Sequence, residues 1–319
     1  MPAINIRPFA SDDYPALAAI GNACFPEFAD IPESLRHRDS ARPAHTRWNH
    51  FLAEIDGVPV GMASYTQRES MYHPRKFDID VIVLPERQRQ GIGSALYDHL
   101  TEQLRPFDPI LIRAFAQEGR MYGPEFLQRR GFVEAMRNWE SRLRLADFDP
   151  EAYTDAIARV TAQGIVIRPL SELRSQPDWE RKMFEMDWAI SLDMPATDVR
   201  TKPTFESWRK RTLDDPDFLP EGWFIALDGD RFIGESAIWN SQLTNDLFVG
   251  STGVLREYRR RGIAMALKVY ATAFARERGA VELKTWNAQS NRAMLSINEA
   301  MGFVKQPPWI EFEKKTGDE

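Results

Sequence analysis

The sequence predicts an α+β fold of the α/β type, in which two tandem domains each hold a mixed β-sheet with helices on both faces. Two observations predict it: short motifs recur in the same order in the two halves of the chain, and strand patterns alternate with helix patterns in each half. The length of 319 residues also fits two domains of about 150 residues. The predicted division is a first domain at 1–148, a linker at 149–163 and a second domain at 164–319.

Four motif pairs carry the repeat, and their spacing is nearly constant. Three pairs lie 171 or 172 residues apart and one pair lies 161 residues apart, which indicates an insertion of about ten residues near the start of the second copy. The pairs are Ile6-Arg7-Pro8 with Ile167-Arg168-Pro169, Asp56-Gly57 with Asp228-Gly229, Gly91-Ile92-Gly93 with Gly262-Ile263-Ala264, and Gly131-Phe132 with Gly302-Phe303.

The elements of the first copy follow from periodicity and turn residues. Asp12 is a plausible cap for the helical spacing that follows it, and Asp56-Gly57 joins two alternating stretches as a hairpin turn. The predicted strands are Ile4–Phe9, Arg47–Ile55, Val58–Tyr65, Phe77–Leu84, Pro109–Phe115 and a stretch from Phe132 onward. The predicted helices are Tyr14–Cys24, Gly91–Leu104 and Met121–Arg130.

The second copy repeats this order after a polar joint in which Glu151–Val160 can form a short helix. Its predicted strands are Gly222–Leu227, Phe232–Trp239, Phe248–Leu255 and Val281–Trp286, and its predicted helices are Gly262–Arg278 and Asn291–Met301.

Composition excludes several classes of protein. Hydrophobic residues make up 43% and charged residues 28%, which rules out wholesale disorder, and the net charge of −6 argues against nucleic acid as a partner. Cys24 is the single cysteine, so an internal disulfide and a multi-cysteine metal site are excluded, and we expect no metal. The chain lacks a run of about 18 apolar residues, so we expect no membrane partner and a cytoplasmic location.

A glycine turn between a strand and a helix occurs once in each copy. In the second copy the basic run Arg259-Arg260-Arg261 precedes Gly262, and in the first copy Gln88-Arg89-Gln90 precedes Gly91. Small residues let the backbone approach a ligand, and the free N–H groups at a helix start favour a phosphate or pyrophosphate. The turn is neither the dinucleotide fingerprint nor a P-loop, since it lacks their glycine and lysine spacing.

The pattern Arg/Gln-x-x-Gly-x-Gly/Ala resembles the signature of the GNAT acetyltransferase superfamily. The second copy adds Trp286-Asn287, Asn291 and Met301-Gly302-Phe303, which resemble the next strand and helix of that family. The resemblance covers nearly the whole chain as a tandem pair. It implies acetyl-CoA as the donor substrate, an amine as the acceptor, and a monomer or homodimer.

The resemblance also implies donor-binding positions in both copies. In the family the pantetheine arm lies between two splayed strands and the pyrophosphate lies on the helix start, while a backbone N–H near Val254 would stabilise the oxyanion. In the second copy these positions are Thr252, Gly253, Val254, Leu255, Arg259, Arg260, Arg261, Gly262, Ile263, Ala264, Met265, Asn287 and Asn291. In the first copy they are Val81, Ile82, Val83, Arg89, Gln90, Gly91, Ile92, Gly93 and Ser94.

The acid and the base of the transfer are less defined by the sequence. Many family members carry a tyrosine at the position of Asn298 here, and the first copy has Leu127 there, so the usual proton donor is absent from both. Asn298 can hydrogen-bond the sulfur, although it is a poor acid, and it is the third candidate catalytic residue beside the two candidate bases. Glu235 and Asp246 are the candidate bases, although each also fits a solvated strand or loop residue.

Other polar residues have an ordinary structural interpretation beside a functional one. In the first copy Asp78 and Asp80 fall on one face of a strand, facing either a cleft or solvent. The segment around His37 is read as a polar loop, and Cys24 as a buried apolar residue.

The segment Met183–Thr212 is where the second copy exceeds the first. In the family such helices form the acceptor wall, so Asp187, Trp188 and Asp193 are the candidate acceptor-binding residues. The plain alternative is an amphipathic helix whose apolar residues pack into the core.

The sequence therefore favours an N-acetyltransferase that acts on a small-molecule primary amine, with the second copy as the catalyst and the first as a non-catalytic domain. Two alternatives stay open: an acyl-CoA-binding regulatory protein without catalysis, and an acetyltransferase for a protein or peptide amine.

Overall fold

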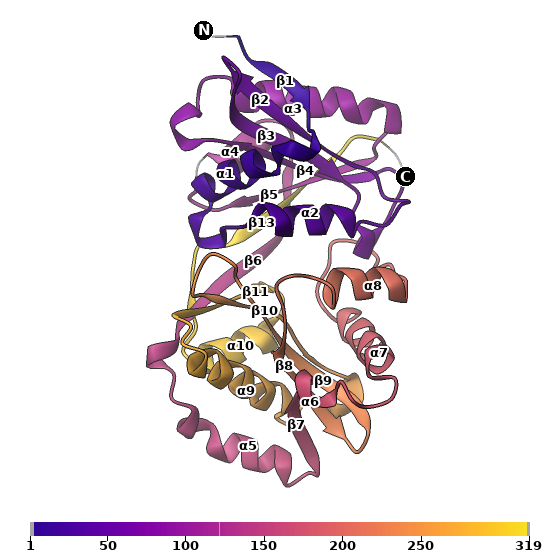
Figure 1. Ribbon diagram of the computed structural model, residues 1–319, viewed down its shortest axis with the longest axis vertical. Helices are drawn as coiled ribbons and strands as arrows, with labels where there is room; N and C mark the ends of the chain where they lie inside the picture. The colour runs from indigo at the N-terminus through magenta and orange to yellow at the C-terminus, as the bar shows by residue number, and fades with distance from the viewer. Residues whose placement is uncertain (1–2, 121, 318–319) are drawn as a thin grey trace. The chain divides into compact units, whose positions relative to one another are not determined.

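The computed structural model describes residues 3–120 and 122–317, and the chain forms two compact units (Figure 1). The first unit combines residues 1–137 with 196–203 and 307–319, and the second combines 138–195 with 204–306. The chain therefore passes between the units several times, and the predicted boundaries at 148 and 164 do not mark these passages.

The first unit is built on a mixed sheet with the strand order β1-β2-β3-β4-β5-β13. All neighbours in it are antiparallel except β4 and β5, which are parallel. The strands are β1 (Asn5–Pro8), β2 (Trp48–Ile55), β3 (Val58–Thr66), β4 (Lys76–Val83), β5 (Leu111–Gln117) and β13 (Trp309–Lys315).

Helices cover both faces of this sheet. On one face α3 (Ile92–Leu104) buries Ile92, Leu96 and Leu100, at a spacing of four residues, in the main core. On the other face α1 (Tyr14–Cys24) packs Leu17 and Ile20 in a smaller cluster. The remaining helices of the unit are α2 (Pro32–Ser40) and the short α4 (Gly123–Gln128).

The second unit repeats this order of strands. Its sheet runs β7-β8-β9-β10-β11-β6, again with one parallel pair, β10 with β11. Its strands are β7 (Ile165–Pro169), β8 (Phe218–Asp228), β9 (Arg231–Trp239), β10 (Leu247–Val254), β11 (Glu282–Ala288) and the two-residue β12 (Val304–Lys305), which pairs with β6 (Val133–Arg144). Its helices are α5 (Thr154–Thr161), α6 (Leu170–Leu173), α7 (Trp179–Ser191), α8 (Phe205–Thr212), α9 (Ile263–Glu277) and α10 (Arg292–Ala300).

Each sheet is completed by a strand that follows the last helix of the other copy. The chain leaves α4 into β6, whose residues from Asn138 onward pair with β11 of the second unit. After α10 and β12 it continues into β13, which pairs along β5 of the first unit. The two copies therefore exchange their final strands.

The backbone of the glycine turn is the same in both copies. Arg89 and Arg260 have φ of 61° and 60°, and Gly91 and Gly262 have φ of 88° and 82°. A non-glycine residue in this left-handed region is uncommon, so its recurrence at one offset supports descent of the two turns from one structural unit.

The predicted fold class is confirmed, and so are most of the predicted elements. The helix Tyr14–Cys24 is found with its predicted bounds, and the first hairpin turns at the predicted Asp56-Gly57. The second hairpin turns one residue later than predicted, at Gly229-Asp230, because Asp228 still pairs with Arg231. The interpretation of the His37 segment as a loop is wrong, because Pro32 starts α2 there. Met121, the predicted start of a helix, lies outside the described residues. Within the described part of the chain, every helix is too short or too polar to span a bilayer.

Candidate functional site

The parallel strands at the centre of the first unit separate at the site. Among the described residues, pairing of β4 with β5 ends at Ile79 and Ala114, although both strands continue. Two parallel strands that part leave backbone N–H and C=O groups without a strand partner, and a ligand laid between them can satisfy those groups.

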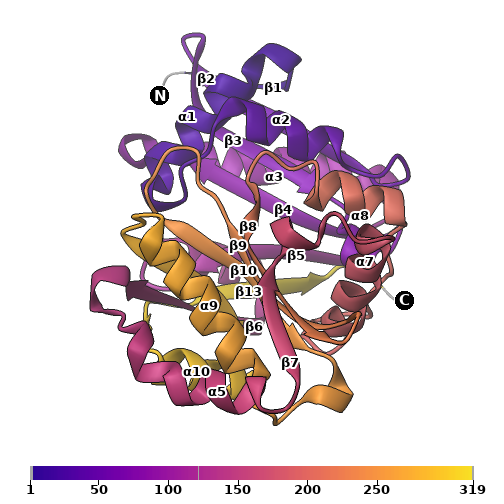
Figure 2. The same ribbon diagram turned by 60° about the horizontal axis from the view of Figure 1, so that its bottom comes forward.

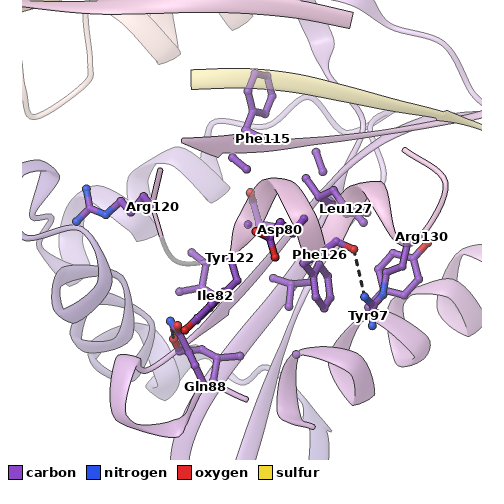
Figure 3. Close-up of a pocket in the computed structure, with 18 of the residues that line it drawn as sticks. Asp80, Ile82, Gln88, Tyr97, Phe115, Arg120, Tyr122, Phe126, Leu127 and Arg130 are labelled. Atoms are coloured by element: carbon purple, nitrogen blue, oxygen red, sulfur yellow. Dashed lines mark hydrogen bonds between the residues drawn. The ribbon is translucent and has the colours of Figure 1, made fainter. Parts of the chain in front are cut away.

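A cavity of about 490 Å³ lies at this separation (Figure 3). Its walls come from both strands, from the start of α3 and from α4, and Trp309 of β13 adds to them. Asp80 points into its middle from β4, while Phe126 and Arg130 face it from the opposite side. Both apolar and charged groups thus line the cavity, as a donor with an apolar arm and anionic phosphates would require.

The first turn of α3 forms one end of the cavity. Gly91 caps this 13-residue helix in a left-handed conformation, and among the described residues nothing lies within 4 Å of a Cβ added there. Gly93, the second residue of the helix, also lines the cavity. The unpaired N–H groups of the helix start are therefore open to an anion.

Two arginines add positive charge beside this helix start. The Arg130 guanidinium lies 3.6 Å from the centre of the Phe126 ring and donates to Ser94 Oγ at 2.8 Å. Arg89 lies over the Tyr122 ring at 4.9 Å. Stacking on these rings holds both planar cations beside the cavity that they line.

Asp80 is the carboxylate that points into the cavity from the central strands. It shares one face of β4 with Asp78, as the strand alternation predicted. Asp80 is exposed at the cavity, yet desolvation by the surrounding protein and the nearby Asp78 carboxylate raise its pKa above the usual range of an aspartate. A carboxylate with a raised pKa is suited to accept a proton near neutral pH.

The position of the expected tyrosine is filled by Leu127, which is buried and lines the cavity. Sequence reasoning missed Tyr97 of α3, whose hydroxyl accepts a hydrogen bond from Lys314 Nζ at 3.1 Å and whose ring lines the same cavity. Tyr97 follows Gly93 by four residues, and this helical spacing could have indicated that both lie on the same face of α3.

The corresponding turn of the second unit is covered by α5 and by the residues that follow it (Figure 2). Val160 Cγ2 lies 3.6 Å from a Cβ added at Gly262, where the equivalent place in the first copy is open. Gln163 of the same segment donates to the Arg261 carbonyl at 3.1 Å, and Tyr153 donates to the carbonyl of Ala300 at the end of α10 at 3.1 Å. The segment thus crosses from the start of α9 to the end of α10.

The basic run of the second copy is partly neutralised within its own unit. Asp193 forms ion pairs with Arg256 and Arg259, and the hydrogen bonds from these arginines lower its pKa. Arg259 also donates to the Val254 carbonyl at 3.0 Å, and Arg261 donates to Gln163 Oε1 at 2.8 Å. These bonds direct cations toward protein acceptors rather than toward a ligand.

The candidate catalytic residues of the second copy are bonded inside the fold. Glu235 is fully buried, accepts from Ser251 at 2.6 Å and Trp223 at 3.0 Å, and burial raises its pKa to about 8. Asp246 accepts from the buried Lys284 at 2.7 Å. The amide of Asn298 is buried and donates to Asn287 Oδ1 at 2.7 Å.

The remaining second-copy candidates also have structural contacts. Asp187 accepts from the Trp208 indole at 2.8 Å, and Asn291 caps α10 by accepting from the Met294 N–H at 3.3 Å. Trp188 is half-buried on α7, and the predicted core packing of that helix is confirmed. α7 packs so closely on β10 that a Cβ added at Gly253 would lie 2.2 Å from Ile190 Cγ2.

Comparisons with known proteins agree with this architecture. The family model described as the acetyltransferase (GNAT) family matches residues 14–132 and 183–303, one match in each copy. The mycothiol acetyltransferase of Geodermatophilus obscurus is 26% identical over 263 residues, which cover 78% of this chain and 77% of that protein.

Two solved structures show the same tandem fold. A tandem GNAT protein from the clavulanic acid biosynthesis pathway is 19% identical, covers 99% of this chain and 100% of its own, and has a TM-score of 0.78. A GCN5-related N-acetyltransferase from Sphaerobacter thermophilus is 20% identical, covers 99% of this chain and 97% of its own, and has a TM-score of 0.68. With a family match in each copy over most of its length, this chain belongs to the acetyltransferase (GNAT) family and is an acyltransferase with two tandem GNAT domains.

Proposed function

We propose that the protein transfers the acetyl group of acetyl-CoA directly to a primary amine of a small molecule, and that the donor binds in the cavity of the first unit. The observation that carries the proposal is the cavity between β4 and β5, which ends at the open first turn of α3. The proposal includes a cytoplasmic location and a monomeric or homodimeric state.

The charges around the cavity support this choice of unit over the second copy, which the sequence had favoured. The N–H groups of α3, together with Arg89 and Arg130, would bind the pyrophosphate, and the backbone of Val81 would bind the pantetheine amides. In the second copy Met301 stands at the position of Arg130, and Val160 stands against Gly262. Metal is not needed by this scheme.

Direct transfer needs a neutral amine, because an ammonium ion has no free electron pair. The amine nitrogen attacks the thioester carbonyl carbon, the carbon–sulfur bond breaks, and the thiolate leaves as CoA. Asp80 is the proposed acceptor of the proton that the amine loses, since it points into the middle of the cavity from β4, whereas the other lining carboxylate, Glu125, lies on α4. The thiolate can take its proton from water or from the departing nitrogen.

An acceptor screen that follows the release of free thiol from acetyl-CoA tests the proposal. Small primary amines and a peptide with a free N-terminus and a lysine are compared, with the Asp80→Asn variant beside the wild-type protein. We expect thiol release with a small amine and its loss in the variant. Release with the peptide alone would contradict the assignment of a small acceptor, and acetyl-CoA binding without any thiol release would contradict catalysis.

A further inference from the structure

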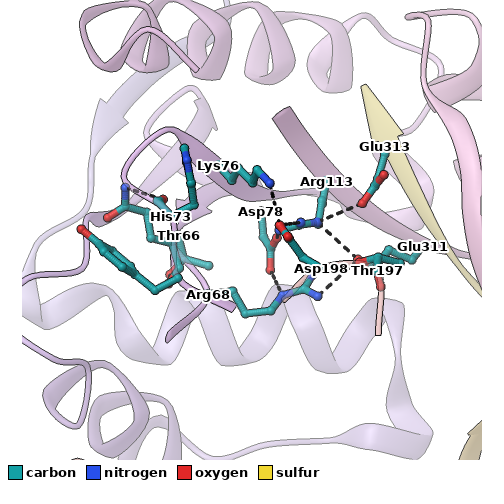
Figure 4. Close-up of polar contacts among 12 residues, drawn as sticks. Thr66, Arg68, His73, Lys76, Asp78, Arg113, Thr197, Asp198, Glu311 and Glu313 are labelled. Atoms are coloured by element: carbon teal, nitrogen blue, oxygen red, sulfur yellow. Dashed lines mark hydrogen bonds and ion pairs between the residues drawn. The ribbon is translucent and has the colours of Figure 1, made fainter. Parts of the chain in front are cut away.

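The sheet face that carries Asp80 continues beyond the cavity into a network of charges within the first unit (Figure 4). Alternation places Asp78 and Asp80 of β4 on this face, and strand register sets Asp78 against Arg113 of β5 and Phe115 against Glu311 of β13. Asp80 and Phe115 also line the cavity. An acceptor that reaches the thioester from this side would therefore meet the network.

A strap from the second half of the chain closes this face. We define the strap as Ala196–Pro203, the stretch between α7 and α8 that belongs to the first unit. Thr201 holds one end, because its N–H donates to the Ser70 carbonyl at 2.8 Å and its hydroxyl accepts from the Tyr72 N–H at 3.0 Å. Thr197 donates to Glu311 Oε1 at 2.9 Å. The strap is thus fixed on both sides of Asp198.

Asp198 binds two cations of the network at once. Its Oδ2 accepts from Lys76 Nζ at 2.9 Å and from Arg113 Nη2 at 2.7 Å, and the Arg113 side chain is only 1% exposed. Although burial opposes it, the bonds from Lys76, the Val199 N–H and Arg113 lower the pKa of Asp198 to about 2. Asp198 is therefore ionised at any pH near neutral.

Asp198 adds one negative charge to a face that is negative overall. Arg68 is already paired, since it donates to Asp78 at 2.7 Å and to Glu311 at 3.2 Å. With Asp198 in place, Lys76 and Arg113 are paired as well. Without it, Lys76 would lose this partner and Arg113 would keep Glu313 at 3.1 Å. Removal would thus make the face beside the site less negative by one charge.

We propose that the strap is the selectivity element for the acceptor of the first unit: by neutralising Lys76 and Arg113, Asp198 lets the site take a cationic amine and disfavours an amine that carries a carboxylate beside it. This inference rests on the proposed donor site in the same unit. It assigns to the second half of the chain a direct part in the specificity of the first.

Matched pairs of acceptors that differ by one carboxylate test the proposal. The pairs are cadaverine with lysine, tyramine with tyrosine, and histamine with histidine. Binding of each compound to the CoA-loaded full-length protein is measured by calorimetry, and kcat/KM is measured where thiol is released. For wild-type protein we expect the member without the carboxylate to bind at least about tenfold more tightly, a difference of about 1.4 kcal/mol.

Three variants separate charge from folding. Asp198→Asn keeps the shape of the side chain and should reduce the preference about tenfold, with acetyl-CoA affinity unchanged. Adding Lys76→Met to it removes one of the two cations that Asp198 binds and should restore most of the preference. Asp108→Asn, which removes a partner of Arg75 from the surface of the same unit, should leave the preference as in wild type.

The pH profile of kcat gives an independent readout. Asp80 is surrounded by Asp78 on β4, His50 on β2, Arg42 after α2 and Arg68 after β3, and further positive charge near these groups should move the profile of Asp198→Asn toward lower pH. Wild-type preference for the carboxylated members, equal weakening of both members by Asp198→Asn, or binding of none of the six compounds would each overturn the inference. Failure of wild-type protein to bind acetyl-CoA would instead overturn the proposed function.

Discussion

Gly93 offers a substitution that should remove donor binding without weakening the fold. It lies in the first turn of α3, lines the cavity and has an ordinary helical backbone, so a side chain there brings no left-handed strain. A Cβ added to it would lie 3.6 Å from Phe126 and 3.8 Å from Val83, which are normal contact distances. The two methyl groups of a valine would then extend into the space that the donor occupies.

The magnitude follows from two opposed effects. Replacing glycine by valine in a helix should stabilise the fold by a few tenths of a kcal/mol, since their helix propensities differ by about that amount. Overfilling a packed site costs about 1–3 kcal/mol, which corresponds to roughly 5- to 150-fold weaker binding of acetyl-CoA.

Calorimetric titration of Gly93→Val with acetyl-CoA measures this loss, and thermal unfolding checks that the fold is kept. The matched control is Ala264→Val, 171 residues later at the corresponding place in α9. The reasoning predicts weak binding in the first variant and wild-type affinity in the second. Full affinity in Gly93→Val together with lost affinity in Ala264→Val would refute it and return the donor site to the second copy.

Three further predictions address the charges. Arg130→Met, which installs the residue that the second copy has as Met301, should weaken acetyl-CoA binding about 10- to 150-fold through loss of a charge-assisted bond, and titration at low and high salt should show a smaller loss at high salt. Asp80→Asn should lower kcat about 10²- to 10⁴-fold. Because desolvation raises the pKa of Asp80 and the base form of this carboxyl is needed, the wild-type rate should rise with pH through that pKa. A rise that the variant retains would exclude Asp80 as the base. Lys268 is buried over the Phe303 ring and has no hydrogen-bond partner among the described residues. Burial lowers its pKa to about 7, against 10.5 in the unfolded chain. Because the unfolded state binds more protons between these pH values, the free energy of unfolding of the wild-type protein should rise across that window by at most about 5 kcal/mol. Denaturant unfolding of Lys268→Met should lack this rise, and parallel curves for the two proteins would contradict the assignment.

Local patterns were enough to predict much of each unit. The apolar residues of α1 recur at helical spacing, with Leu17 and Ile20 buried on one side, and the helix predicted from this spacing has the observed bounds. The recurrence of Gly91 as Gly262 identified two turns whose dihedral angles are indeed alike. By contrast α2 was not predicted, since its sequence is polar and was interpreted as a loop, whereas Pro32 starts the helix.

What the sequence could not supply were contacts between distant segments. The alternation after Phe132 predicts a strand, but nothing in it tells which sheet that strand joins, so the exchange of β6 and β13 could not be foreseen. The two glycine turns differ through long-range neighbours: Val160 covers Gly262, whereas Gly91 is open. The strap with Asp198 reaches Lys76 across more than a hundred residues of sequence. Motif quality alone therefore favoured the second copy, while tertiary packing favours the first.

A crystal structure of the protein soaked with acetyl-CoA tests the central claim most directly, because it shows which unit holds the donor. The account predicts one acetyl-CoA in the cavity between β4 and β5, with its pyrophosphate on the first turn of α3 and its thioester near Asp80. Acetyl-CoA bound instead at the start of α9, with α5 displaced from Gly262, would contradict it.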